Sequence, residues 1–254
     1  MELVKLKKNY NQFGYCIIKN FINSKSIKNL KTFTKIIKKT KPTSNQIMKY
    51  YENSILNGNK EILVRAEYFY DFHNGLKKFL DNKKIHRILH FLMNGKCILF
   101  KEKINFKPSG CRADKLHQDS QGGWNKFSKN FISILVSIEK STKINGCLEF
   151  DVSGNNKNRS IGRIFKPLKV NELNKPDFKS IELNPGDVLF FNHYIPHRSK
   201  SNQSHFNRTQ LYITYNLKKD GNFRKKYFKE KRISFPPNNE RPQGKKFKYK
   251  IWFL

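Results

Sequence analysis

Hydrophobic positions recur with two different periods along the chain, and the change falls near residue 95. Before it, apolar residues mostly return every three or four positions, which is typical of helices with one buried face. After it, they alternate or gather in short runs, which is typical of β-strands. The pattern therefore predicts one domain with a mostly helical part over residues 1–94, a strand-rich core over 95–217 and an extension over 218–254 that packs on the core.

The first part is predicted to hold one early strand and three helices. The strand lies in the β-rich run at 13–22, and the helices cover residues 26–39, 59–70 and 74–92. The first helix has the clearest signals, because Asn23 or Ser24 can cap its start and Pro42 ends it. Its apolar face is formed by Ile27, Leu30, Phe33, Ile36 and Ile37.

The strand-rich part is predicted to contain strands near 98–107, 131–138, 146–152, 186–192 and 209–216. Several short strands separated by turn residues indicate a sandwich or barrel. Alternation within the first strand places four polar side chains on one face, namely Lys101, Lys103, Asn105 and Lys107. We expect the extension to be irregular and to be held on the core by Tyr249, Trp252 and Phe253.

The chain is strongly basic. Its 52 Lys and Arg outnumber its 19 Asp and Glu, which gives a formal net charge of +33 and invites a nucleic-acid interpretation. However, 42 of the basic residues are Lys, spread over the whole chain, and only ten are Arg. Recognition of bases and phosphates favours the Arg fork. We therefore interpret the charge as compositional bias on a solvated surface that attracts anionic small molecules, and expect no nucleic-acid partner.

Membrane and secretory features are missing from the sequence. No apolar run reaches the ~18–20 residues of a membrane span, and the charged start lacks the apolar stretch of a secretory signal. The four cysteines, at positions 16, 97, 111 and 147, form no CxxC pair. Free thiols in a reducing compartment are the simplest interpretation, so we expect a cytoplasmic protein without a membrane partner.

An ordered set of residues in the strand-rich part predicts a metal centre. His117 and Asp119 are two positions apart, so both side chains point to one side of an extended segment. With His197, which follows the strand that begins at Gly186, they make the two-histidine, one-carboxylate set that binds non-haem Fe(II). Arg208, eleven residues after His197, can form a bidentate pair with a dicarboxylate that chelates the metal.

Two nearby histidines compete with His197 as the distal ligand. His193 and His205 lie four residues before it and eight residues after it, and either can be an ordinary structural or exposed residue. The strand from Gly186 can run in, turn and present His197 at the mouth of the barrel. We therefore predict His197 as the ligand.

These motifs resemble the phytanoyl-CoA dioxygenase family of Fe(II)/2-oxoglutarate-dependent oxygenases. The similarity covers most of the chain: the opening strand at 13–22, His-Gln-Asp at 117–119, Asn-Gly-Cys-Leu-Glu at 145–149, and the block from Gly186 through Ser199 to Arg208. It implies a mainly β fold with flanking helices around a double-stranded β-helix, the cupin-like jelly roll. One departure is the absence of the family's Pro-Gly-Ser-His turn after 145–149, which affects the loop bordering the active site rather than the metal ligands.

The resemblance also implies roles for individual residues. The catalytic iron would be bound by His117, Asp119 and His197. The co-substrate 2-oxoglutarate would be held by Arg208 at its distal carboxylate, with help from Ser199, Asn105 and Gln118. The enzyme would hydroxylate its substrate with O2 and release succinate and CO2, with ascorbate as a reductant.

The substrate is indicated by fewer residues. Lys101 and Lys103 next to Asn105 can bind the anionic group of a small polar or zwitterionic metabolite, and Trp124 can form a wall or a cation-binding face. The alternative is that both lysines are solvated and Trp124 fills the core. The strings at 101–107, 117–124 and 235–241 are similar to the branch of the family that includes 2-aminoethylphosphonate dioxygenases, which hydroxylate the carbon next to phosphorus.

Other functions remain as alternatives. An oxygenase of the same class could act on an acyl-CoA, an amino acid or a nucleic acid, but AlkB-like enzymes carry a second Arg six residues after the first, where this chain has Thr214. A halogenase would lack the carboxylate of Asp119. A basic nucleic-acid-binding protein without catalysis would leave the ordered motif as a coincidence.

Overall fold

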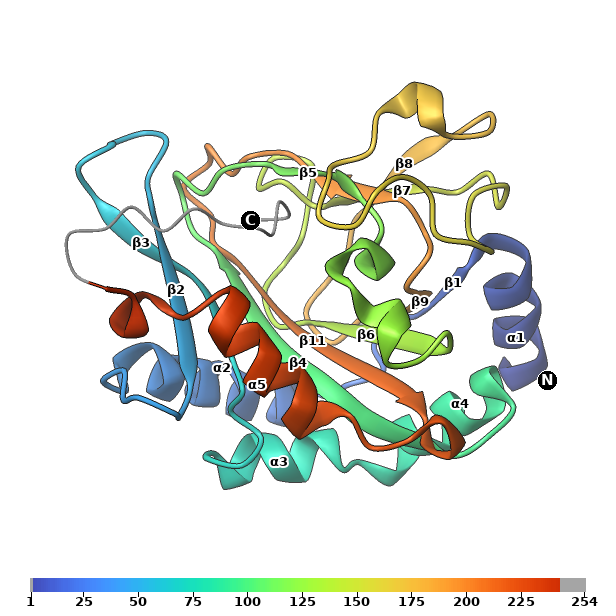
Figure 1. Ribbon diagram of the computed structural model, residues 1–254, viewed down its shortest axis with the longest axis horizontal. Helices are drawn as coiled ribbons and strands as arrows, with labels where there is room; N and C mark the ends of the chain where they lie inside the picture. Colours follow the sequence, from blue (N-terminus) through green and yellow to red (C-terminus); the bar gives the residue numbers. More distant parts are fainter. Residues whose placement is uncertain (1, 243–254) are drawn as a thin grey trace.

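Two antiparallel β-sheets packed against each other form the centre of the computed structural model, which describes residues 2–242 (Figure 1). The larger sheet has seven strands in the order β1-β9-β6-β11-β4-β3-β2, and the smaller sheet has four in the order β5-β10-β7-β8. Strands distant in sequence are neighbours in both sheets, as expected for a jelly roll. The predicted double-stranded β-helix with flanking helices is confirmed.

The strand bounds show which segments build each sheet. The larger sheet consists of β1 (Tyr15–Ile18), β2 (Met48–Asn53), β3 (Glu61–Glu67), β4 (Cys97–Lys107), β6 (Phe131–Ser137), β9 (Val188–Asn192) and β11 (Arg208–Leu217). The smaller sheet consists of β5 (Asp114–His117), β7 (Leu148–Asp151), β8 (Phe178–Ile181) and β10 (His197–Ser199). The predicted strands at 98–107, 131–138, 146–152, 186–192 and 209–216 are therefore confirmed, whereas the short β5, β8 and β10 were not predicted.

Four helices precede β4 in the chain: α1 (Glu2–Phe13), α2 (Ser24–Lys39), α3 (Asn74–Leu80) and α4 (Lys83–Met93). Figure 1 shows α2, α3 and α4 along one face of the larger sheet. Their apolar side chains share a core with the sheet, for example Leu30 and Leu89 with Ile134 and Ile213. The central strands β6 and β11 are buried along their whole length, because one face meets the helices and the other faces the interior between the sheets. None of the described helices is long and apolar enough to cross a membrane.

The predicted helix at 26–39 is confirmed, and its cap is Asn23, whose side chain accepts a hydrogen bond from the Ser26 amide. The predicted helix at 74–92 is two helices. The chain breaks at Asp81, and the side chain of Asn82 starts α4 by accepting from the amides of Lys84 and Ile85.

The predicted helix at 59–70 is wrong, because this segment contains β3. Ile62, Val64 and Ala66 are buried at every second position, the period of a strand, and β3 pairs with both β2 and β4. The first part of the chain therefore holds three strands instead of one. This correction brings Arg65 of β3 opposite Asn105 of β4, on the interior face of the larger sheet.

The C-terminal extension is also more regular than predicted, because residues Arg224–Ser234 form helix α5. The Arg224 guanidinium anchors the helix by donating to both carboxylate oxygens of Glu102 and to Asp71, at 2.6–3.0 Å. The predicted anchors Tyr249, Trp252 and Phe253 lie outside the described residues. That the whole chain forms one domain stays a prediction.

Candidate active site

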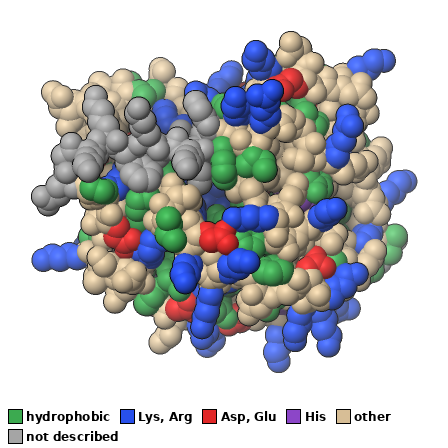
Figure 2. All heavy atoms as spheres, in the orientation of Figure 1, with side chains coloured by type: hydrophobic (Ala, Val, Ile, Leu, Met, Phe, Trp, Pro, Cys, Tyr) green, Lys and Arg blue, Asp and Glu red, His purple; other side chains and the backbone are tan. Residues whose placement is uncertain are grey.

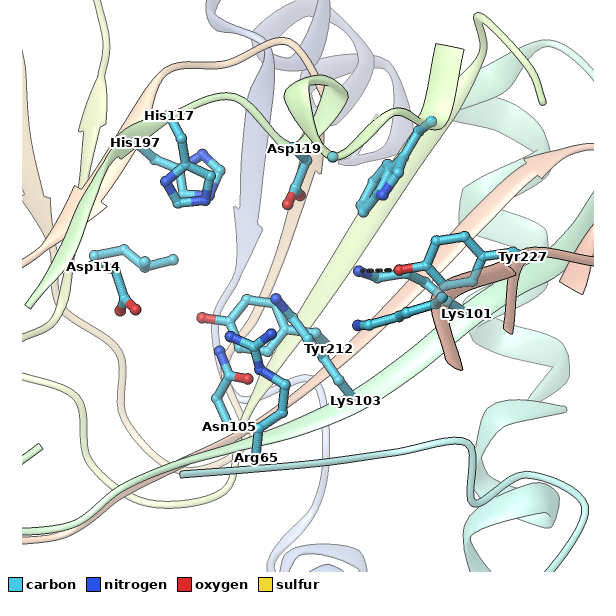
Figure 3. A pocket seen from close by; sticks show the side chains of 14 residues that line it. Arg65, Lys101, Lys103, Asn105, Asp114, His117, Asp119, His197, Tyr212 and Tyr227 are labelled. Atoms are coloured by element: carbon cyan, nitrogen blue, oxygen red, sulfur yellow. Dashed lines mark hydrogen bonds between the residues drawn. The ribbon is translucent and has the colours of Figure 1, made fainter. Parts of the chain in front are cut away.

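The candidate metal ligands meet where β5 and β10 lie side by side in the smaller sheet. His117 ends β5, His197 begins β10, and the two residues are paired in register, with ring centroids 4.3 Å apart. Asp119 opens the short 3-10 helix that follows β5. One ligand atom from each of the three side chains lies within 4.8 Å of the others, so the three can hold one metal ion. Figure 3 shows both imidazoles and the Asp119 carboxylate at the edge of one pocket.

The two imidazoles are oriented for metal binding by backbone carbonyls. His117 Nδ1 lies 2.6 Å from the oxygen of Lys115, and His197 Nδ1 lies 3.0 Å from the oxygen of Ile195. A proton on each Nδ1 satisfies these contacts and leaves Nε2 with its lone pair, as metal-binding histidines require. Burial, followed by the neighbouring His197, lowers the pKa of His117 to about 3, so this imidazole is neutral at physiological pH.

The Asp119 carboxylate completes this donor set. Burial alone would raise its pKa, but His197, Lys103 and Lys101 together lower it, so the side chain is an anion. Two imidazoles and one carboxylate fit a divalent transition metal such as Fe(II). His193 stays outside this group and packs against Tyr194, with ring centroids 3.8 Å apart.

Arg208 lies beyond the three ligands, in a small cavity between the sheets. Its side chain is 1% exposed, Nη1 donates to the carbonyl of Gly146, and Nε is buried without a hydrogen-bond partner among the described residues. Lys107 lies directly opposite Arg208 in the register of β4 and β11 and lines the same cavity. An unsatisfied buried guanidinium N–H next to a second cation fits a carboxylate ligand such as the distal end of 2-oxoglutarate.

Ser199 has different partners from those we expected. Its hydroxyl lies 2.5 Å from both Lys107 Nζ and Asp114 Oδ2, and Lys107 and Asp114 also form an ion pair at 3.1 Å. Burial alone would raise the pKa of Asp114, but Lys107 and the Ser199 hydroxyl hold it far below its usual range. Ser199 therefore belongs to a buried group that positions Lys107 beside Arg208.

Asn105 and Gln118, the other two predicted co-substrate residues, point in different directions. Asn105 lines the pocket, and its Oδ1 is buried without a partner among the described residues. Gln118 is completely buried and faces away, because it lies between His117 and Asp119 in an extended segment. Its amide donates to three backbone carbonyls and accepts from one backbone amide, namely those of Asn156, Arg159, Tyr194 and Ile161. The structure therefore does not bring Gln118 into the site.

Because Gln118 fastens the loop after β7 to the metal-binding segment, replacing it should affect folding more than chemistry. Gln118→Leu keeps the volume of the side chain but leaves several buried backbone groups without a hydrogen-bond partner. We therefore expect the free energy of unfolding to fall by about 2–4 kcal/mol. Urea unfolding measures this effect, with the exposed Gln203→Leu as the control. A stable Gln118→Leu protein with weakened 2-oxoglutarate binding would instead favour a direct contact with the co-substrate.

The predicted substrate residues line the same pocket as the metal ligands (Figure 3). The Lys101 ammonium lies 4.4 Å from the centre of the Trp124 ring and 3.5 Å from the hydroxyl of Tyr227. The Lys103 ammonium lies 4.8 Å from the centre of the Tyr212 ring. In the described part of the chain, neither lysine forms an ion pair. Burial, followed by repulsion from Lys101, lowers the pKa of Lys103 to about 7.

Trp124 combines the two roles weighed for it. It is 3% exposed and packs edge-on against Phe100 and Phe131, so it fills the core. One face also borders the pocket, and the cation on that face is Lys101 of the chain itself.

Sequence reasoning missed several pocket residues, among them Arg65, Tyr212, Tyr227 and Lys231. Arg65 was hidden because its segment was predicted to be helical. Tyr212 lies opposite Lys103 in register and could have been found from the alternation of the predicted strand at 209–216. Tyr227 and Lys231 are four residues apart on α5 and were hidden in a segment predicted to be irregular.

Neither the position of the second Arg nor the distribution of basic side chains supports the nucleic-acid alternatives. Thr214, at the position of the second Arg of AlkB-like enzymes, is buried and its hydroxyl lies 2.9 Å from that of Ser133. On the face seen in Figure 2, Lys and Arg side chains are scattered among other residues, outside the area drawn in grey. A scattered distribution is what a solvated basic surface would show.

Comparisons with known proteins agree with this geometry. The model of the phytanoyl-CoA dioxygenase family matches residues 10–210. A 2-aminoethylphosphonate dioxygenase from uncultured bacterium HF130_AEPn_1 is 35% identical over 95% of this chain and 92% of its own length. A methylphosphonate hydroxylase from Gimesia maris is 31% identical over 89% of this chain and 85% of its own length.

Solved structures show the same fold at lower identity. The crystal structure of EctD from S. alaskensis with 2-oxoglutarate and 5-hydroxyectoine superposes with a TM-score of 0.71, at 14% identity, over 85% of this chain and 76% of that one. The family match includes the three candidate metal ligands and Arg208. The chain belongs to the phytanoyl-CoA dioxygenase family and is an Fe(II)- and 2-oxoglutarate-dependent dioxygenase.

Proposed function

We propose that the enzyme hydroxylates a small organophosphonate, such as 2-aminoethylphosphonate, at the carbon next to phosphorus. In this proposal His117, Asp119 and His197 hold the iron, and Arg208 holds the distal carboxylate of 2-oxoglutarate. Bound iron supplies the activation of O2. The substrate C–H bond becomes C–OH as 2-oxoglutarate loses CO2 and becomes succinate, and ascorbate keeps the iron reduced.

The chain's own residues bind and orient the two organic reactants. Lys107, held by Ser199 and Asp114, adds a second cation next to Arg208, which suits the negative charge of a dicarboxylate. Asn105 lies between this cavity and the main pocket, because it lines both. The co-substrate would therefore extend from the metal ligands toward Arg208, and the substrate would occupy the side lined by Lys101 and Lys103.

The observation that carries the substrate class is this pair of lysines. Both side chains line a pocket that also contains the candidate metal ligands, and neither has a carboxylate partner within ion-pair distance among the described residues. Buried cations without partners are costly, which favours an anionic ligand. A phosphonate is a suitable anion, and the two relatives described above are named for phosphonate substrates. Trp124 supports Lys101 in this arrangement instead of binding a cationic group of the substrate.

The test is succinate formation with Fe(II), ascorbate and 2-oxoglutarate in the presence of different substrates. We expect strong stimulation by 2-aminoethylphosphonate or methylphosphonate, and none by amino acids, acyl-CoA thioesters or single-stranded DNA. Lys103→Met should raise the KM for the phosphonate about 10- to 100-fold, because a charged hydrogen bond is lost, and leave the KM for 2-oxoglutarate nearly unchanged.

The exposed Lys140→Met is the matched control and should behave like the unmodified enzyme. Stimulation by a compound without a phosphonate group, with no response to any phosphonate, would contradict the substrate class and keep the dioxygenase.

A further inference from the structure

Helix α5 brings two side chains into the active-site pocket from outside the family match. Tyr227 and Lys231 line the pocket together with the candidate metal ligands, whereas the match to the family model ends at residue 210. The two residues are one helical turn apart and face the same way. In Figure 3 the hydroxyl of Tyr227 points toward the Lys101 ammonium, from the side of the pocket opposite His117 and His197.

A buried ion pair holds Lys231 in place. Its ammonium lies 2.5 Å from Glu67 Oε2, and the two side chains are 8% and 0% exposed. Burial alone would raise the pKa of Glu67, but Lys231, Lys101 and Arg65 together lower it to about 2, so Glu67 is an anion. An ammonium has three donors, and the contact with Glu67 is the one hydrogen bond that the Lys231 ammonium makes within the described residues.

The pocket has more positive than negative side chains. Its cations are Arg65, Lys101, Lys103 and Lys231. The carboxylates that face them are Glu67 and Asp119, the latter at the candidate metal centre, while Asp114 is paired with Lys107. Arg65 contributes a buried Nε without a partner in the described chain, and its only ion pair there is a long 3.5 Å contact with Glu67. Four basic side chains in this pocket therefore face two carboxylates, and burial lowers the pKa of two of them, Lys103 and Lys231, to about 7.

A rigid anchor keeps α5 in register with the pocket. Arg224, two turns before Lys231, forms its bidentate pair with Glu102 of β4, one residue from both Lys101 and Lys103. Tyr227 and Phe228 pack into the aromatic cluster under the helix together with Phe100. The position of Lys231 is therefore fixed relative to the lysines of β4, as preorganised binding of an anion requires.

We infer that Lys231 and Tyr227 of α5 are substrate-specificity residues. Together with Arg65 and the pair Lys101 and Lys103 they complete a subsite for the tetrahedral dianionic end of the substrate. This inference rests on the proposed function, in which that end is a phosphonate. A phosphonate carries up to two negative charges at neutral pH and offers three acceptor oxygens, like a phosphate monoester. It suits the excess of basic over acidic side chains and the unused donors of Lys231 and Arg65. A bound dianion favours the charged forms of the lysines more than a single carboxylate does.

The test is calorimetric titration of methylphosphonate and of inorganic phosphate into the full-length enzyme, loaded with Fe(II) and 2-oxoglutarate and kept free of O2. Lys231→Met should raise the Kd for methylphosphonate about 10- to 100-fold, and Tyr227→Phe about 3- to 10-fold, as each removes a donor to a charged group. Lys229→Met, on the exposed side of the same helix, should leave the Kd unchanged. The Kd for 2-oxoglutarate should stay the same in all three variants.

If Lys231→Met alone does not fold, the double variant Glu67→Gln/Lys231→Met replaces it in the titration, because it removes both charges of the buried pair. An unchanged Kd for methylphosphonate in a folded variant that lacks Lys231 would overturn the subsite, even if the enzyme oxidises phosphonates. Conversely, an unmodified enzyme that binds methylphosphonate through Lys231 but oxidises no phosphonate would keep the subsite and reject the proposed function. Failure of the unmodified enzyme to bind either anion would overturn both.

Discussion

Replacing Asp119 with alanine should abolish iron binding and reduce substrate-dependent succinate formation by about a thousandfold or more, equivalent to about 4 kcal/mol of transition-state stabilisation. The change removes the carboxylate of the candidate triad and leaves only its two imidazoles. It also removes one of the two carboxylates that face Lys101 and Lys103. Iron content after reconstitution and the rate of succinate formation measure the two effects separately.

The control is Asp177→Ala, which removes an exposed carboxylate far from the metal ligands in sequence and paired with Lys179. It should keep both iron and activity. Full iron content and turnover in Asp119→Ala would refute the assignment of the triad.

The second large effect is expected at Arg208. Arg208→Met should raise the KM for 2-oxoglutarate about 30- to 1,000-fold, because truncating one member of a buried charged pair costs about 2–4 kcal/mol. The KM for the phosphonate should change much less. The side chain is buried and its Nε has no hydrogen-bond partner among residues 2–242, so loss of the guanidinium removes a donor that no solvated residue can replace.

Arg198→Met is the matched control for this experiment. Arg198 lies between His197 and Ser199 in sequence, but its side chain pairs with Glu149 and is 38% exposed. It should leave the KM for 2-oxoglutarate unchanged. If Arg208→Met binds 2-oxoglutarate normally, the distal carboxylate lies elsewhere, and Lys107 becomes the first residue to replace.

The strand-rich core could be predicted because its signals are local. The spacing of His117 and Asp119 places both on one side of an extended segment, and the structure brings both next to His197. The same alternation explains why Gln118, which lies between them, points away from the site and forms its hydrogen bonds with backbone groups instead. In an extended segment, a residue adjacent to a metal ligand points to the opposite side, so alternation alone indicates that it does not bind the co-substrate.

The remainder of the site depends on contacts between residues distant in sequence, which local patterns do not contain. The apolar residues Ile62 and Ala66 are four positions apart, which also suits a helix. The pairing of β3 with β4 in the structure shows that Arg65 belongs to the site. Helix α5 has a weak apolar pattern, and its buried Arg224 and Lys231 are compensated by carboxylates more than 100 residues away. The sequence alone does not distinguish a buried Lys from an exposed one, because burial depends on a carboxylate partner distant in the chain.

Short sequence motifs indicated a similarity to the phosphonate-oxidising branch of the family. The two relatives named for phosphonate substrates extend that similarity over 95% and 89% of this chain. Those comparisons establish the family and the reaction class, and the proposal of an anionic substrate rests on the basic side chains of the pocket. The basic composition of the chain contributes to this site through four side chains in particular, namely Arg65, Lys101, Lys103 and Lys231.

The most direct test of the central claim is product analysis of a reaction that contains 2-aminoethylphosphonate, 2-oxoglutarate, Fe(II), ascorbate and O2. Phosphorus NMR follows the phosphonate, and chromatography follows succinate. The account predicts that a hydroxylated phosphonate and succinate form in equal amounts and that both disappear in Asp119→Ala. Recovery of unchanged 2-aminoethylphosphonate and unchanged methylphosphonate, while another compound drives succinate formation, would contradict it.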